Sequence, residues 1–223
     1  GDITTALEYY HKSLIKYEKY NNEQGLAQAL NNVGHIYQNQ QDEDLALEYF
    51  HRSLALYKKL EIDRGIATLL NSIGFVYFRK KNAEKSMFYL EQMHVQLQRL
   101  NSKYEKVWHS RYINLSALNL NFSKSWSQAI QLLEKTLKET TLGNSEEALL
   151  SISLCMIYFQ QGNLKEVKRI INSFTKRDSW YLKQMGNEWL FNFKAIEVLL
   201  HFDLGNDQLA ESKILSFQRK YAN

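Results

Sequence analysis

The sequence predicts an all-α solenoid built of antiparallel helix pairs, and two observations carry that prediction. The 223-residue chain contains no proline and nine glycines. Because proline removes a backbone donor and clashes with the preceding turn, a chain without proline favours long uninterrupted helices. In addition, the first hundred residues repeat with a period of 40, and each repeat carries the spacing of two amphipathic helices.

The repeat appears when the sequence is shifted by 40 positions against itself. The number of identical residues at this one offset, in both halves of the unit, is too large to result from composition alone. The coincident residues are Gly25 with Gly65, Ala27 with Ala67, Leu30 with Leu70, Asn31 with Asn71, Gly34 with Gly74, Tyr37 with Tyr77, Tyr9 with Tyr49, His11 with His51, Leu14 with Leu54, and Tyr17 with Tyr57.

Each unit contains two helical patterns separated by a short polar turn. In the first unit, apolar and small residues recur at spacings of three and four over residues 27–37 and again over residues 45–57. Asp42, at the end of the turn, is expected to cap the second helix. Gly34 stands where two helix backbones must approach closely, and Phe50 is expected to fill the space beside it.

A family resemblance follows from small and aromatic residues at fixed positions. The residues are Leu30, Val33, Gly34, Tyr37, Ala46, Phe50 and Ser53 in the first unit, and Leu70, Ile73, Gly74, Tyr77, Ser86, Leu90 and Met93 in the second. Their spacing resembles that of the tetratricopeptide repeat, with a period of 40 and without the family's usual proline. The resemblance implies a right-handed superhelical α-solenoid, and the long period is similar to that of bacterial regulatory and sensor proteins of this family.

The second half of the sequence follows the same design less regularly. Helix pairs are expected over residues 113–136 and 148–171, and a final pair consists of the run Trp180–Leu204 and a helix containing Ala210. Since no linker interrupts the chain, we expect one solenoid domain over residues 1–223, with regular repeats over 2–100 and degenerate repeats and capping helices over 101–223. The chain begins without methionine, which we interpret as a segment of a longer protein.

The sequence carries no signature of catalysis or of a cofactor. The glycines do not form a phosphate-binding loop, and the six histidines do not show the spacing of metal ligands. Cys155, the only cysteine, stands at the repeat position of Gly34 and is expected to be buried, whereas a nucleophilic thiolate needs an exposed, electropositive setting. We therefore expect no enzyme activity, no cofactor and no metal.

Charge and hydropathy argue against two further classes of partner. The net charge is +4, with 28 basic and 24 acidic residues interspersed, and most aromatic residues occupy repeat packing positions, so nucleic-acid binding is not expected. No stretch approaches the roughly 18 apolar residues that a membrane-spanning helix needs, so membrane insertion is not expected either. We expect a cytoplasmic protein.

The family resemblance implies a ligand surface, because the first helix of each tetratricopeptide pair lines a concave groove. Asparagine is a poor helix former, and its amide offers both donors and an acceptor to an extended peptide. Two arginines would favour an acidic group, and two phenylalanines would seat an apolar side chain. The expected groove residues are Gln28, Asn31, Asn32, His35, Gln38 and Asn39, then Thr68, Asn71, Ser72, Phe75, Phe78 and Arg79, and finally Arg111, Asn114, Leu115, Leu118 and Asn121.

These observations favour a non-catalytic interaction module that binds a peptide segment or a partner domain in its groove. By analogy with the family, it would belong to a larger bacterial signalling or regulatory protein. Two alternatives stay open. The chain could be a sensory domain that controls an attached kinase, cyclase or DNA-binding domain, or it could be a self-association module that forms a homodimer through its apolar C-terminal helices.

Overall fold

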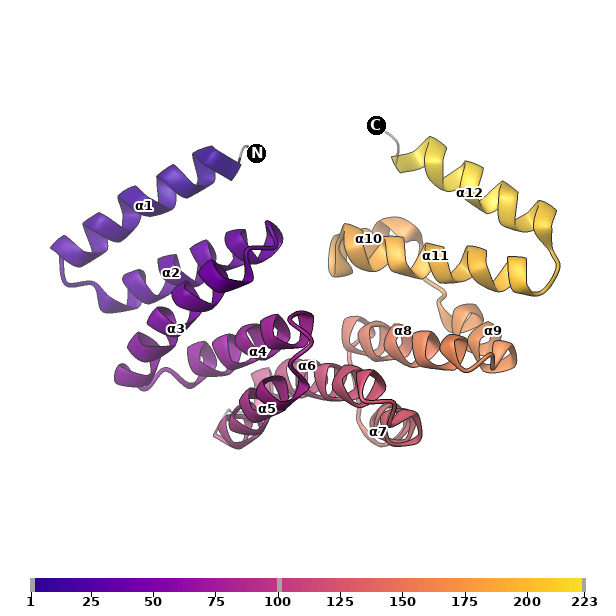
Figure 1. Ribbon diagram of the computed structural model, residues 1–223, viewed down its shortest axis with the longest axis horizontal. Helices are drawn as coiled ribbons and strands as arrows, with labels where there is room; N and C mark the ends of the chain where they lie inside the picture. Colours follow the sequence, from indigo (N-terminus) through magenta and orange to yellow (C-terminus); the bar gives the residue numbers. More distant parts are fainter. Residues whose placement is uncertain (1–2, 100–101, 222–223) are drawn as a thin grey trace. The chain divides into compact units, whose positions relative to one another are not determined.

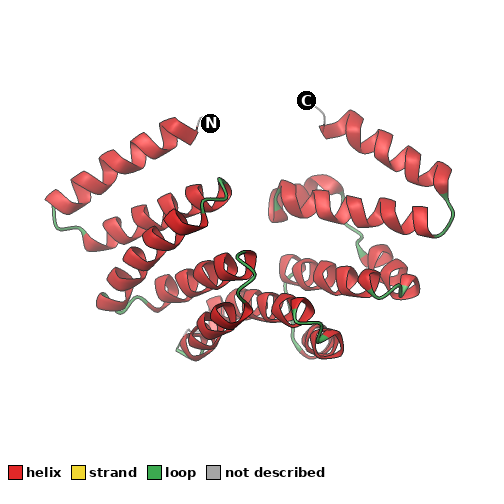
Figure 2. Cartoon of the chain, in the orientation of Figure 1, coloured by secondary structure: helices red, strands yellow, loops and turns green. Residues whose placement is uncertain are grey.

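The computed structural model describes residues 3–99 and 102–221, and within these ranges it contains twelve α-helices and no strand (Figure 2). The predicted all-α fold of helix pairs is therefore confirmed. The helices are α1 Ile3–Lys19, α2 Glu23–Asn39, α3 Glu43–Lys59, α4 Asp63–Arg79, α5 Ala83–Leu97, α6 Ser102–Phe122, α7 Trp126–Glu139, α8 Asn144–Gln160, α9 Leu164–Ser173, α10 Asp178–Met185, α11 Asn187–Asp203 and α12 Asp207–Tyr221.

One type of turn joins the first helices. After α2, Gln41 adopts a left-handed conformation with φ of 63°. Its N–H donates to the carbonyl of Gln38 at 3.1 Å, while the N–H of Asp42 donates to that of Tyr37 at 2.9 Å, which closes the helix in a Schellman motif. The side chain of Asp42 then accepts from the N–H of Leu45 at 3.1 Å, so the predicted cap is confirmed and one residue both ends α2 and begins α3.

The same left-handed turn recurs along the chain and sets the helix spacing. Helices α1 to α5 begin at residues 3, 23, 43, 63 and 83, because helices of 17 residues alternate with turns of three. The left-handed residues at the equivalent position are Asn21, Gln41, Glu61 and Lys81 in these turns, and Lys124, Gly162 and Gly205 in three later ones. A regular turn of this kind explains a strict repeat without proline.

The helices group into two compact units, Gly1–Ser123 and Lys124–Asn223. The first unit holds α1 to α6 and the second holds α7 to α12, so the boundary falls inside the helix pair expected over residues 113–136. A single solenoid over the whole chain stays a prediction.

In the first unit each helix packs against the next, and α4 also packs against α6. Figure 1 shows α2, α4 and α6 following one side of this unit, with α3 and α5 on the other side. The buried core between the two sides is apolar, with Phe50, Leu70, Ile73, Leu90 and Met93 almost fully enclosed. The layout places one helix of every pair on the same face.

The close approach predicted at Gly34 is present. A Cβ added at Gly34 would lie 2.6 Å from two ring carbons of Phe50, whose side chain is 0% exposed. Nearby, the Ser53 hydroxyl donates to the carbonyl of Ala27 at 2.6 Å, so α2 and α3 are also joined by a buried hydrogen bond. The small residues therefore let α3 pack directly on the backbone of α2.

Ion pairs link the start of one helix to the end of the next. Glu43 Oε1 lies 2.8 Å from an Arg79 guanidinium nitrogen, and Asp44 Oδ1 lies 2.9 Å from Lys80 Nζ. Glu23 pairs with Lys59 in the same way. Acids near helix N-termini and bases near C-termini also complement the helix dipoles.

The second unit departs from the expected helices at Gly186. The run Trp180–Leu204 was expected to form one helix, and this expectation is wrong. Gly186 adopts φ of 86°, so α10 ends at Met185 and α11 begins at Asn187. The bend lets Tyr181 stack on Trp189 with ring centroids 5.1 Å apart.

Cys155 lies in the interior of the second unit, as expected, and is 0% exposed. Burial raises the pKa of its thiol to about 12, so the thiolate is strongly disfavoured at neutral pH. Cys155 therefore serves as a small apolar packing residue between α8 and α9.

A chain of ion pairs joins α10, α11 and α12. Lys194 Nζ lies 3.0 Å from Asp178 Oδ1 and 3.2 Å from Glu197 Oε2, while Glu197 Oε1 lies 2.7 Å from Lys213 Nζ. Burial opposes ionisation of Glu197, but Lys213 and Lys194 outweigh it and hold the pKa of this carboxyl below its usual value. The network therefore fixes α12 on α11 by charge as well as by packing.

Candidate functional site

The candidate site is the surface formed by α2, α4 and α6 on the side away from α3 and α5, called here the α2/α4/α6 face (Figure 1). Two side-chain contacts hold its helices next to one another. The Arg79 guanidinium of α4 donates to the carbonyl of Gln38 in α2 at 3.0 Å, and the Phe78 ring meets the Phe122 ring of α6 with centroids 6.4 Å apart. The predicted site residues of α2 and α4 therefore lie on neighbouring helices.

Three asparagines provide the polar part of this face. Asn31, Asn32 and Asn71 are all half-buried. The side-chain oxygen of Asn31 is buried and has no hydrogen-bond partner among the described residues. The amides of Asn32 and Asn71 likewise make no hydrogen bond within the described part of the chain, so both can bond to an outside group.

Aromatic rings provide the apolar part. Phe75 and Phe78 are half-buried, and their ring centroids lie 6.4 Å apart. Both pack on the core of the first unit together with Leu118. Phe122 on α6, which was not predicted, is 47% exposed and contacts Phe78. Phe75, Phe78 and Phe122 are called here the aromatic row. An exposed aromatic edge supported from behind by the core is a rigid seat for an apolar side chain.

Several predicted site residues are instead bound within the protein. Arg79 was expected to offer a positive charge to a ligand, but its guanidinium is already paired with Glu43 and with the carbonyl of Gln38. The Gln38 side chain is 9% exposed and lies 2.9 Å from His35 Nδ1. Ser72 is 5% exposed, and its hydroxyl donates to the carbonyl of Thr68 at 3.1 Å. Of these contacts, the one from Arg79 to Gln38 joins α4 to α2, and those of the Gln38 and Ser72 side chains lie within one helix.

The remaining predicted residues divide between the surface and the core. Asn39 is exposed at the end of α2, and Asn114 is half-buried on α6. Arg111 is exposed, with its guanidinium 5.1 Å from the ring of Trp108 on its own helix. Leu115 was expected to face the groove, but it is 3% exposed and belongs to the core, because α6 packs on α4 through this residue.

Among the described residues, no group of three histidine, cysteine or acidic side chains is arranged to hold a metal ion. The same part of the chain contains no helix that is both long enough and apolar enough to cross a membrane.

A family model for the tetratricopeptide repeat matches residues 1–59 and, in a second register, residues 25–94. Residues 1–94 belong to the tetratricopeptide repeat family. The matched segment ends near the boundary that the sequence predicts between regular and degenerate repeats. Repeats of this family are generally non-catalytic scaffolds for interactions between proteins.

Solved structures extend the likeness in fold beyond the segment that the family model matches. BtubC (BKLC) from P. vanneervenii superposes with a TM-score of 0.63 and 17% sequence identity, over 79% of this chain and 77% of that one. PilF from Pseudomonas aeruginosa superposes with a TM-score of 0.52 and 15% identity, over 99% of this chain and 94% of that one. No curated protein matches the sequence. At such identities the likeness concerns the fold.

The sequence contained a pattern that predicts the ion pair between Arg79 and Glu43, which makes Arg79 unavailable to a ligand. Within the tetratricopeptide region, the acids Glu23, Glu43 and Asp44 each precede their basic partner by 36 residues. A recurring acid–base spacing of that kind, near the 40-residue period, indicates pairs between neighbouring helices. No comparable pattern in the sequence predicts that Phe122 lies on the α2/α4/α6 face, because its position depends on the length of α6.

Proposed function

We propose that the α2/α4/α6 face binds an extended segment of a partner protein. The observation that carries this proposal is the set of half-buried asparagines on α2 and α4 whose amides have no partner among the described residues. Buried polar groups are usually satisfied within the protein, as those of Ser72 and Gln38 are, whereas the half-buried amides of Asn32 and Asn71 remain open to another molecule. Their availability therefore favours a role in binding.

The chemistry of the asparagines suits a peptide backbone. An extended segment presents N–H and carbonyl groups in alternation, and each asparagine amide can accept a hydrogen bond from the N–H and donate one to the carbonyl. The buried oxygen of Asn31 requires a donor, and leaving such an acceptor unpaired costs about 1–3 kcal/mol. Because that oxygen is enclosed by the protein, the amides of Asn32 and Asn71 are the groups that would bond to the peptide backbone.

The aromatic row supplies the anchor. An apolar side chain of the partner, placed against Phe75 and Phe78, would bury area beside rings that are already held by the core. Such anchors provide most of the affinity in peptide recognition, whereas polar contacts fix register. Because an unstructured segment must be ordered on binding, micromolar affinity is the expected range.

Charge plays a smaller part in this proposal than the sequence suggested. With Arg79 paired to Glu43, selection of an acidic side chain no longer has support from α4. We place the module in a larger bacterial signalling or regulatory protein of the cytoplasm, on the strength of the long-period repeats alone. The partner is thus defined by an extended backbone and an apolar anchor.

The test is selection of peptides from a displayed random library against the whole chain, followed by titration of the enriched peptides. The double variant Asn32→Ala and Asn71→Ala should bind them at least about tenfold more weakly. It should melt no lower than the native chain, because alanine is the better helix former. The matched control is Asn172→Ala, at an exposed position of α9. Equal binding by the double variant would overturn the proposal.

One observation favours self-association as a second candidate function. In the second unit, large apolar side chains of α11 and α12 remain exposed: Phe191 at 57%, Leu199 at 46%, Phe202 at 63% and Leu209 at 46%. Exposed apolar groups concentrated on two adjacent helices are typical of an interface between proteins. Sedimentation of the chain over a range of concentrations tests whether it forms dimers.

A further inference from the structure

Within the described part of the chain, helix α12 is covered on the side that packs on α11. It lies along α11 in Figure 1 and packs on it through residues spaced by three and four. Ala210 is 4% exposed, Lys213 Nζ lies 2.7 Å from Glu197 Oε1, and the ring of Phe217 lies 5.8 Å from that of Phe191. These contacts fix which side of α12 faces away from the second unit.

The opposite side of α12, called here the outer α12 face, is exposed along its length. Leu215 lies at its centre and is 43% exposed. Two small residues beside it, Ser212 and Ser216, leave a shallow hollow that could admit a side chain or let another helix approach closely. The residues of the face are Gln208, Glu211, Ser212, Leu215, Ser216 and Arg219.

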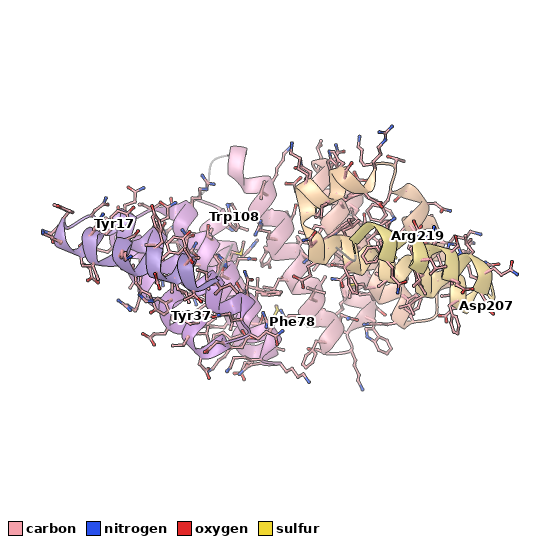
Figure 3. All side chains as sticks on the ribbon, turned by 90° about the horizontal axis from the view of Figure 1, so that it is seen from above. Tyr17, Tyr37, Phe78, Trp108, Asp207 and Arg219 are labelled. Carbon is pink, nitrogen blue, oxygen red and sulfur yellow. The ribbon has the colours of Figure 1, made fainter. Side chains whose placement is uncertain are left out.

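The charges of the outer α12 face are arranged symmetrically about Leu215. Glu211 precedes it by four residues and Arg219 follows it by four, so each charge lies about 6 Å along the axis from the centre. Figure 3 shows Asp207 and Arg219 at opposite ends of α12, which gives the helix an acidic end and a basic end. An antiparallel copy of such a helix presents opposite charges at both ends.

We propose that two copies of this chain pair through their outer α12 faces, antiparallel, with Leu215 on the two-fold axis. Glu211 of each copy then lies against Arg219 of the other, and the antiparallel arrangement of the two helix dipoles is favourable. A second copy is the occupant that this surface fits, because the face is complementary to itself. The inference rests on the outer α12 face and not on the exposed apolar side chains of α11, and it does not depend on peptide binding.

The experiment uses complementary charge reversals in the whole chain and measures the dimer dissociation constant by sedimentation. Glu211→Lys alone places like charges against each other at both ends of the interface, and Arg219→Glu alone does the same. Each variant should dimerise at least about tenfold more weakly than the native chain. An equimolar mixture of the two variants should regain native dimerisation, because each introduced charge meets its opposite and native Glu211 meets native Arg219.

A cross-linking variant tests the position of the axis. Leu215→Cys introduces a thiol at an exposed site, while Cys155, the only native cysteine, is fully buried. Oxidation should give a covalent dimer with Leu215→Cys and none with the matched surface variant Lys165→Cys on α9. Circular dichroism of all variants checks the fold.

A native chain that stays monomeric at high concentration would overturn the proposal. A dimer unaffected by the single charge reversals, or a mixture that does not recover, would also overturn it, because another surface would then form the contact. Since the peptide selection uses α2 and α4, its failure is distinguishable from failure here.

Discussion

Gly34 and Gly74 occupy the same repeat position, yet the structure predicts that alanine stabilises the chain at Gly74 and not at Gly34. A Cβ at Gly74 would lie 3.5 Å from Leu115 Cδ2 and 3.5 Å from the carbonyl oxygen of Ser86, which is ordinary van der Waals contact. Glycine inside a helix is less favourable than alanine by about 1 kcal/mol. Gly74→Ala should therefore stabilise the chain by about 1 kcal/mol.

At Gly34 the same Cβ would lie 2.6 Å from two carbons of the Phe50 ring. Phe50 is 0% exposed, so the ring cannot move into solvent. Overpacking of a filled core costs about 1–3 kcal/mol, which offsets or exceeds the gain in helix propensity. Gly34→Ala should therefore be less stable than Gly74→Ala by about 1–3 kcal/mol.

Urea unfolding followed by circular dichroism measures this difference. The repeat supplies its own control, because leucine stands at position 90 where the first unit has Phe50. Adding Phe50→Leu to Gly34→Ala should recover part of the loss, and the double-mutant cycle should show coupling between the two sites. Equal stabilisation by Gly34→Ala and Gly74→Ala, or additive effects in the cycle, would refute the packing argument.

Two further predictions concern turns and charge. Lys81 holds a left-handed φ of 57° where the later turn has Gly162, so Lys81→Gly should stabilise by about 1 kcal/mol and Gly162→Ala should destabilise by a similar amount in thermal melts. Because Lys213 and Lys194 lower the pKa of Glu197, its contribution is present above the unfolded-state pKa and is lost as pH falls through the folded-state value. Glu197→Gln should cost about 2 kcal/mol at pH 7 and progressively less in acid, whereas a constant difference across pH would contradict the assignment.

The helix pairs of the first unit could be predicted because their determinants are local and repeated. Asp42 predicts a helix cap and Gly34 predicts a close approach of α2 and α3, and both are present in the structure. Cys155 was predictable as a buried residue by its alignment with Gly34. In each case a short-range pattern and the helical period are enough to determine the environment of the residue.

The contacts between neighbouring helix pairs were harder to predict, because they depend on how α2, α4 and α6 are placed side by side. Arg79 reaches Gln38 and Glu43, and Leu115 turns into the core, only once those helices are packed. The break at Gly186 was missed for a different reason. Apolar residues continue on both sides of this glycine, so hydropathy alone does not mark the bend.

The most direct test of the central claim is an NMR titration of the whole chain with a peptide obtained by the library selection. The side-chain amide signals of Asn32 and Asn71 should shift on binding and become protected from exchange with solvent, while those of Asn172 and Asn192 on the second unit should not move. Shifts confined to other surfaces, with the signals of Asn32 and Asn71 unchanged at saturation, would contradict the assignment of the α2/α4/α6 face as the binding site.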